Sequence, residues 1–96
     1  MIVSFADKMT EDLFHGSTSA KTRKLSLNMQ KAALIKLDIL NAAHSILDLK
    51  SPPGNRLESL GGNLKGNYSI RINDQWRLAF RLENSNAYDV QIIDYR

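Results

Sequence analysis

The sequence contains no cysteine, only two prolines and no long apolar run. Without cysteine the chain can form neither a disulfide framework nor a Cys-based zinc site, so its core alone must supply its stability. No stretch approaches the roughly 18 consecutive apolar residues of a transmembrane helix, and the apolar start at residues 1–7 is too short for a signal peptide. We therefore expect a cytoplasmic protein that does not associate with membranes.

Acidic residues are missing from one long stretch of the chain. Between His15 and Leu37 there is no Asp or Glu, whereas five basic residues fall inside: Lys21, Arg23, Lys24, Lys31 and Lys36. The whole chain carries a formal net charge of +3. Such a stretch is either a solvated helix face or a surface for phosphate backbones or for an acidic partner.

Length and composition predict one folded domain over residues 1–96. Hydrophobic residues make up 43% of the sequence and charged residues 24%, which is close to ordinary globular domains and excludes disordered and fibrous classes. A chain of this length holds a single core.

Two helices are predicted in the first half. Asp7 can cap a short helix that Gly16 ends. A longer helical signal runs from about Thr22 to Leu49, before the Pro52-Pro53 break. Its apolar stripe has residues three or four positions apart: Met29, Ala33, Leu37, Leu40, Ala43 and Leu47.

The second half shows the alternation of apolar and polar residues that is typical of strands. Residues 2–6 form one further strand candidate, and the others are 56–60, 68–73, 76–83 and 87–95. The order of elements predicts an α+β domain, in which two N-terminal helices pack on one face of a largely antiparallel sheet of four to five strands.

Strand parity brings two arginines together. If the apolar residues on both sides of the Asn73-Asp74-Gln75 turn share the buried face, Arg71 lies directly opposite Arg77. Like charges in that arrangement are destabilising, yet two guanidinium groups suit an anion such as phosphate. The alternative is that each arginine is paired with a carboxylate or solvated.

The same parity places two other residues. With Leu82 opposite Tyr88, Arg81 falls across from Asp89 and is interpreted as a structural ion pair. Tyr95 projects onto the face of the arginine pair, close to Arg77.

Other candidate residues have simpler interpretations. His15 and His44 lie in the helical half and are expected at the surface or in helix packing. Gly61, Gly62 and Gly66 lack the Gly-Lys-Ser/Thr ending of a phosphate-binding loop and are turn glycines. Tyr68 and Trp76 could stack on bases, but their alternation favours the buried face.

From Arg56 onward the sequence resembles the HigB branch of the RelE/ParE toxin superfamily, often described as plasmid-maintenance killer proteins. The most specific matching run is Tyr68-Ser69-Ile70-Arg71-Ile72-Asn73-Asp74-Gln75-Trp76-Arg77, and the ending Ala87-Tyr88-Asp89-Val90 through Asp94-Tyr95 also matches. The first half agrees in length, in its basic long helix and in the Pro-Pro-Gly break, so the resemblance covers nearly the whole chain.

The resemblance implies a RelE-like fold and cleavage of messenger RNA on the ribosome, without a metal or another cofactor. In this chemistry a ribose 2′-hydroxyl attacks the adjacent phosphate, which requires a base, cationic donors and an acid. The implied base is Glu58, and the implied phosphate ligands are Arg71 and Arg77. We also expect RNA contacts from basic side chains, namely Lys21, Arg23, Lys24 and Lys65.

The chain departs from the family pattern in two places. Members usually end in Asp-Tyr-His, whereas this chain ends in Asp94-Tyr95-Arg96, and a guanidinium cannot act as a general acid near neutral pH. Either Tyr95 donates the proton or Arg96 serves only as a charge stabiliser, and the activity is expected to be weaker. Gly61 stands where a lysine is common, which removes one phosphate contact.

Two other functions fit the same fold. A ParE-like toxin would inhibit gyrase without cutting RNA, and a degenerate toxin would act only with its antitoxin in operator repression. In each case the resemblance implies a HigA-like helix-turn-helix antitoxin that forms a heterotetramer with the toxin and contacts operator DNA. For the nuclease, the ribosome and messenger RNA are further partners.

Overall fold

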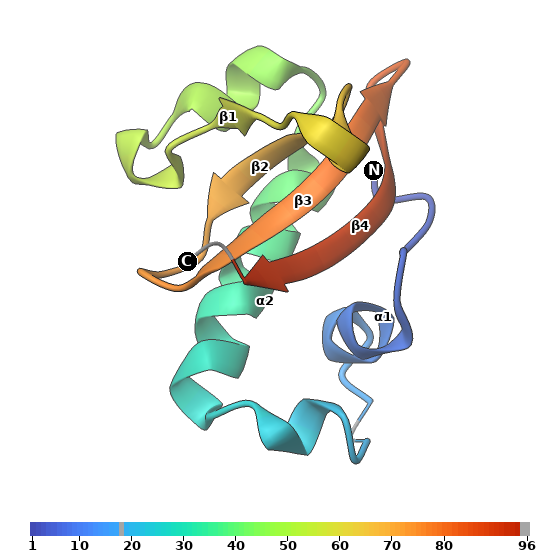
Figure 1. Ribbon diagram of the computed structural model, residues 1–96, viewed down its shortest axis with the longest axis vertical. Coiled ribbons are helices and arrows are strands. Elements are labelled where there is room, and N and C mark those ends of the chain that lie inside the picture. The colour runs from blue at the N-terminus through green and yellow to red at the C-terminus, as the bar shows by residue number, and fades with distance from the viewer. Residues whose placement is uncertain (18, 95–96) are drawn as a thin grey trace.

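The computed structural model describes residues 1–17 and 19–94, and it has two helices and a four-stranded sheet (Figure 1). The helices are α1 (Lys8–Phe14) and α2 (Leu27–Ala42). The strands are β1 (Glu58–Ser59), β2 (Tyr68–Arg71), β3 (Trp76–Glu83) and β4 (Asn86–Asp94). They pair in sequence order, each antiparallel to its neighbour. The predicted α+β architecture is confirmed.

The core lies between the sheet and the helices. Six of its apolar side chains, each no more than 1% exposed, come from α2 and from three strands: Leu37, Leu40, Ile70, Leu78, Phe80 and Val90. Tyr68 and Trp76 pack against this cluster from the same face of the sheet, as their alternation predicts. The opposite face of the sheet is therefore left to the polar residues of β2 and β3.

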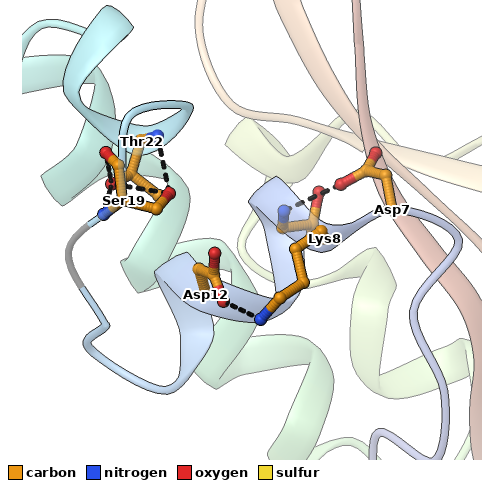
Figure 2. A network of polar contacts seen from close by, with 6 residues as sticks. Asp7, Lys8, Asp12, Ser19 and Thr22 are labelled. Atoms are coloured by element: carbon orange, nitrogen blue, oxygen red, sulfur yellow. Dashed lines mark hydrogen bonds and ion pairs between the residues drawn. The ribbon is translucent and has the colours of Figure 1, made fainter.

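Helix α1 begins at a side-chain cap, as predicted. The Asp7 carboxylate accepts a hydrogen bond from the backbone N–H of Thr10 at 2.8 Å, and Lys8 pairs with Asp12 one turn later (Figure 2). Gly16 follows the helix with φ of +73°, a left-handed conformation that suits glycine. The buried Thr10 hydroxyl accepts from the Ile92 N–H at 3.2 Å, which fixes α1 against β4.

The predicted long helix over residues 22–49 is wrong at both ends. Before α2 the chain forms a short 3₁₀ turn, η1 (Thr22–Lys24), and Ser26 then caps α2 by accepting from the Met29 N–H at 3.1 Å. After Ala42 the chain turns into η2 (Ile46–Lys50), where the Asp48 carboxylate accepts from the His44 N–H at 2.8 Å.

Local side-chain hydrogen bonds compete with the helix at these positions, which is why apolar spacing overestimates its length. One predicted stripe residue is misplaced as a result. Leu47 lies in η2 and is 66% exposed, whereas the other five stripe residues are buried.

Residues 2–6 run beside β4 but do not form a named strand. They make parallel bridges between Ile2 and Ala87 and between Phe5 and Val90. Their neighbour on β4, Asp89, has φ of +54° and lies in an irregularity of the β3–β4 pairing. The Asp89 N–H donates to the Ser4 hydroxyl at 2.9 Å, so this bulge is held by the N-terminal segment.

The bulge corrects the predicted β3–β4 register. Leu82 lies opposite Ala87 and Arg81 lies opposite Tyr88, one residue away from the expected pairs. The ion pair between Arg81 and Asp89 nevertheless forms, at 3.4 Å, because the bulge turns Asp89 back toward Arg81. Arg81 also pairs with Glu83, and that hydrogen bond together with the charge of Asp89 raises the pKa of the guanidinium.

The connections around β1 are short. Segment η3 (Pro53–Asn55) precedes β1 and η4 (Gly62–Leu64) follows it, so the predicted strand over residues 56–60 is reduced to Glu58 and Ser59. None of the helices in the described part of the chain is long and apolar enough to cross a membrane.

Candidate functional site

Arg71 and Arg77 lie directly opposite each other at the end of the β2–β3 hairpin, as strand parity predicts. The turn between them is fixed by Asn73, whose side-chain oxygen accepts from the N–H groups of Gln75 and Trp76, both at 2.9 Å. Both arginines project from the face of the sheet opposite the α2 core. The hairpin therefore imposes a close approach of two like charges.

The two arginines have different surroundings. Arg77 is only 5% exposed, and its Nε donates to the Ser69 hydroxyl at 2.7 Å. Its Nη2 donates to the Ser69 carbonyl oxygen at 3.1 Å and to the Arg56 carbonyl oxygen. These three acceptors are neutral, and together they fix the orientation of the guanidinium.

Arg71 lies at the rim of the site. Its side chain is 35% exposed and pairs with Asp74, which is 98% exposed at the tip of the turn. An ion pair with so exposed a carboxylate is weak, and another anion can readily replace the Asp74 carboxylate. Arg71 thus remains available to a phosphate, whereas an arginine held in a buried ion pair would not be.

Glu58 belongs to the same face of the sheet. It is exposed on β1 and lies opposite Ser69, the residue that holds Arg77. The structure therefore brings three of the predicted site residues together: Glu58, Arg71 and Arg77. Tyr95 and Arg96, the other two, lie outside the described residues.

A lysine from α2 reaches the same region. Lys36 is half-buried, and its Nζ lies 2.6 Å from the side-chain oxygen of the buried Asn55. Burial, and secondly the positive charge of Arg71, lower the pKa of Lys36. Lys36 was recognised in the sequence only as part of the acid-free stretch, without an expected place in the site.

The four residues predicted to contact RNA do not join the arginines. Lys21, Arg23 and Lys24 are exposed in and beside η1, whereas Lys65 is exposed after η4. Figure 1 shows η1, in cyan, at the opposite end of the molecule from β1. These cations form two separate exposed groups.

The sequence did not indicate the residues that hold Arg77. Ser69 could have been found by parity, because it alternates with Ile70 and so shares the face of Arg71. The carbonyl of Arg56 has no sequence signal, since its position depends on η3 and on a left-handed Arg56 with φ of +44°. His15 and His44 are exposed, as expected, and neither belongs to this site.

The arrangement of these side chains is suited to anion recognition beside a carboxylate. Two guanidinium groups offer forked donors for phosphate oxygens, and one of them is held rigidly. Residues 1–17 and 19–94 contain no cluster of three or more His, Asp or Glu side chains placed to hold a metal ion.

Bacterial toxins are among the known proteins similar to this chain. The sequence model described as "RelE-like toxin of type II toxin-antitoxin system HigB" matches residues 3–96. Toxin HigB-1 of Vibrio cholerae serotype O1 is 43% identical over 81 residues, which cover 84% of this chain and 83% of that protein.

Solved structures confirm the fold. The YoeB toxin in the YoeB-YefM toxin-antitoxin heterotetramer of Staphylococcus aureus superposes with a TM-score of 0.60 at 20% identity, covering 100% of this chain and 95% of that one. A mutant of YafQ from E. coli gives a TM-score of 0.59 at 17% identity, covering 98% and 91%. The sequence match and the shared RelE/YoeB-like fold lead to one conclusion: the chain belongs to the HigB-like family of RelE-like toxins of type II toxin-antitoxin systems.

Proposed function

We propose that this toxin is a metal-independent endoribonuclease that cuts messenger RNA on the ribosome. The observation that carries the proposal is the pairing of Arg71 with a rigidly held Arg77, beside the carboxylate of Glu58. RelE-like toxins are generally endoribonucleases, and a like-charged pair of this kind is suited to a phosphate group.

The proposed reaction uses the RNA's own 2′-hydroxyl as the nucleophile. Glu58 takes the proton of that hydroxyl, and the 2′-oxygen attacks the adjacent phosphorus. Arg71 and Arg77 stabilise the additional negative charge on the phosphorane oxygens. The bond from phosphorus to the 5′-oxygen then breaks, which leaves a 2′,3′-cyclic phosphate and a 5′-hydroxyl.

The leaving 5′-oxygen needs a proton. We assign this role to Tyr95, with Arg96 stabilising charge, because a guanidinium does not release its proton near neutral pH. The cations at Lys21, Arg23, Lys24 and Lys65 contact RNA on either side of the site.

The proposed partner is a HigA-like antitoxin that forms a heterotetramer with the toxin and reads operator DNA. Supporting this, α2 has a second apolar face that the core does not use. Leu27 and Ile35 are 72% and 59% exposed there, and Leu34 lines a surface pocket of about 280 Å³ between α1, η1 and α2. Lys31 borders the same pocket, so an amphipathic helix with acidic side chains would fit it.

A cellular experiment tests the nuclease. We would express the wild type and Arg77→Ala without antitoxin and map the 5′ ends of translated transcripts. New in-frame cuts and growth arrest with the wild type, and neither with the variant, support the proposal. Growth arrest with intact transcripts would favour gyrase inhibition, and well-expressed protein without any effect would indicate a toxin that has lost its chemistry.

A further inference from the structure

Lys36 is an unusual lysine because it is half-buried without an acidic partner. Its Nζ makes one hydrogen bond, to the side-chain oxygen of Asn55 at 2.6 Å, and no carboxylate of residues 1–17 or 19–94 forms a salt bridge with it. An ammonium group has three donors. Two of them are therefore left for solvent or a ligand.

Asn55 is a rigid support for this lysine. It is fully buried, and its side-chain nitrogen donates to the carbonyl oxygens of Leu49 at 3.2 Å and Ser51 at 3.4 Å. Because both amide protons are used in this way, the side-chain oxygen has to face Lys36. The position of the lysine Nζ is thus determined by the fold of residues 49–55.

The same segment also holds Arg77. The Arg56 carbonyl, one residue after Asn55, accepts from Arg77, and Arg71 lies near enough to lower the pKa of Lys36. Figure 1 shows the turn before β1 close to the end of β2. Three cations from α2, β2 and β3 thereby converge around residues 55 and 56.

Such a convergence of positive side chains is suited to an anion. Burial, and secondly Arg71, lower the pKa of Lys36, which means that the free protein holds this charge at a cost. Among residues 1–17 and 19–94, the carboxylate that pairs with Arg71 is that of the exposed Asp74. A phosphate diester would interact favourably with all three cations at once.

We propose that Lys36 is a third cation of the anion site and binds a backbone phosphate of the RNA strand held by Arg71 and Arg77. The inference rests on the proposed function for the identity of the ligand. It assigns to Lys36 a binding role, with Asn55 as the residue that positions it.

The test compares Lys36→Met with a matched control, Lys50→Met, at an exposed lysine that belongs to neither proposed binding surface. The probe is a single-stranded 2′-O-methyl RNA oligonucleotide, which lacks the attacking hydroxyl and is not cut. Affinity is measured by fluorescence anisotropy over a range of KCl concentrations. Loss of one phosphate contact lowers the slope of log affinity against log salt by about 0.7, a change that a merely structural role would not produce.

The proposal expects the lower slope and weaker binding for Lys36→Met, wild-type values for Lys50→Met, and recovery of the slope in Lys36→Arg. An unchanged slope in Lys36→Met would overturn it, even if stability had decreased. If Lys36→Met does not fold, the wild type is titrated with inorganic pyrophosphate, which should shift the NMR signals of the Asn55 side-chain amide; no shift would overturn the proposal.

These results also separate the two proposals. A wild type that binds the oligonucleotide with a Lys36-dependent slope but does not cut messenger RNA would keep this inference and reject the nuclease. If the toxin cuts messenger RNA but Lys36→Met keeps the wild-type slope of log affinity against log salt, the nuclease proposal stands and the inference about Lys36 is rejected.

Discussion

At the scale of single residues, Arg77 differs from the other arginines in how it is held. Three hydrogen bonds to Ser69 and Arg56 fix the plane of its guanidinium in a nearly buried position. Arg81, on the same strand, is half-buried and pairs with two carboxylates. The neutral oxygens hold Arg77 in one orientation, whereas the two carboxylates neutralise the charge of Arg81.

We predict that Arg77→Lys abolishes most of the activity although it keeps the charge. A lysine cannot make the three bonds of the planar guanidinium, so the rate of RNA cleavage should fall by about 100-fold or more. Arg81→Lys is the matched control and should cleave at nearly the wild-type rate. Equal rates for Arg77→Lys and the wild type would show that the fixed geometry of Arg77 is not needed.

Stability is predicted to depend on pH through Lys8 and Asp12. The hydrogen bond from Lys8 lowers the pKa of Asp12 below 3.8, so the pair stabilises the fold above that pH and loses this effect as the pH falls through the lowered value. Asp12→Asn should therefore melt at a lower temperature than the wild type at pH 7. The difference should narrow below pH 3.8; a constant difference at all pH values would exclude the ionic contribution.

Sequence reasoning was most successful for residues whose role depends on strand parity. It placed Arg71 opposite Arg77 because alternation leaves few choices across a short turn. It missed Lys36 and the Arg56 carbonyl, since both depend on how the 51–56 segment folds against α2. Contacts between segments that are far apart in the chain leave no periodic pattern of residues from which they could be predicted.

At the scale of elements, the β2–β3 hairpin determines the spacing of the arginines. Asn73→Ala removes the acceptor for two backbone donors in the turn. We predict a loss of about 1–2 kcal/mol in the free energy of unfolding, with cleavage reduced further than the unfolded fraction explains. Urea denaturation and a cleavage assay on the same protein would check this; full activity in the folded fraction would mean that the turn is not needed to align the pair.

Helix α2 offers one face to the core and another to solvent. The sequence predicted its core-facing residues correctly but placed its C-terminal end too late. The core stripe was correctly assigned up to Ala43, but the helix ends at Ala42 and Leu47 is exposed. The spacing of apolar residues gives no information about the side-chain hydrogen bonds that end a helix. The β-bulge at Asp89 caused the one-residue register error in β4 for a similar reason.

The outer face of α2 is predicted to bind the antitoxin. Leu27→Glu should weaken the toxin-antitoxin complex by tenfold or more, because it adds a charge of the same sign as the expected acidic partner. Its free energy of unfolding should change by no more than about 0.5 kcal/mol, since the side chain is 72% exposed. Leu47→Glu, at an exposed leucine outside the pocket, is the control; equal affinities for both variants would place the antitoxin elsewhere.

At the scale of the whole molecule, the arginine pair lies on the face of the sheet opposite the helical core, and Lys36 is the α2 residue that approaches it, through Asn55. The core holds the sheet on α2, and the polar face carries Glu58, Arg71 and Arg77. An antitoxin on the helical side would cover the cations near η1 without touching the arginines. Bound antitoxin would then compete with the ribosome for the toxin's basic surface rather than fill the site.

The proposed function depends most on whether this toxin cuts messenger RNA only on the ribosome. The most direct measurement incubates purified toxin with a labelled messenger RNA, alone and engaged on purified ribosomes, and identifies the ends of any fragments. We predict fragments with a 2′,3′-cyclic phosphate and a 5′-hydroxyl only when ribosomes are present, and none with Arg77→Ala. Intact messenger RNA on the ribosome with active, folded toxin would contradict the proposed function.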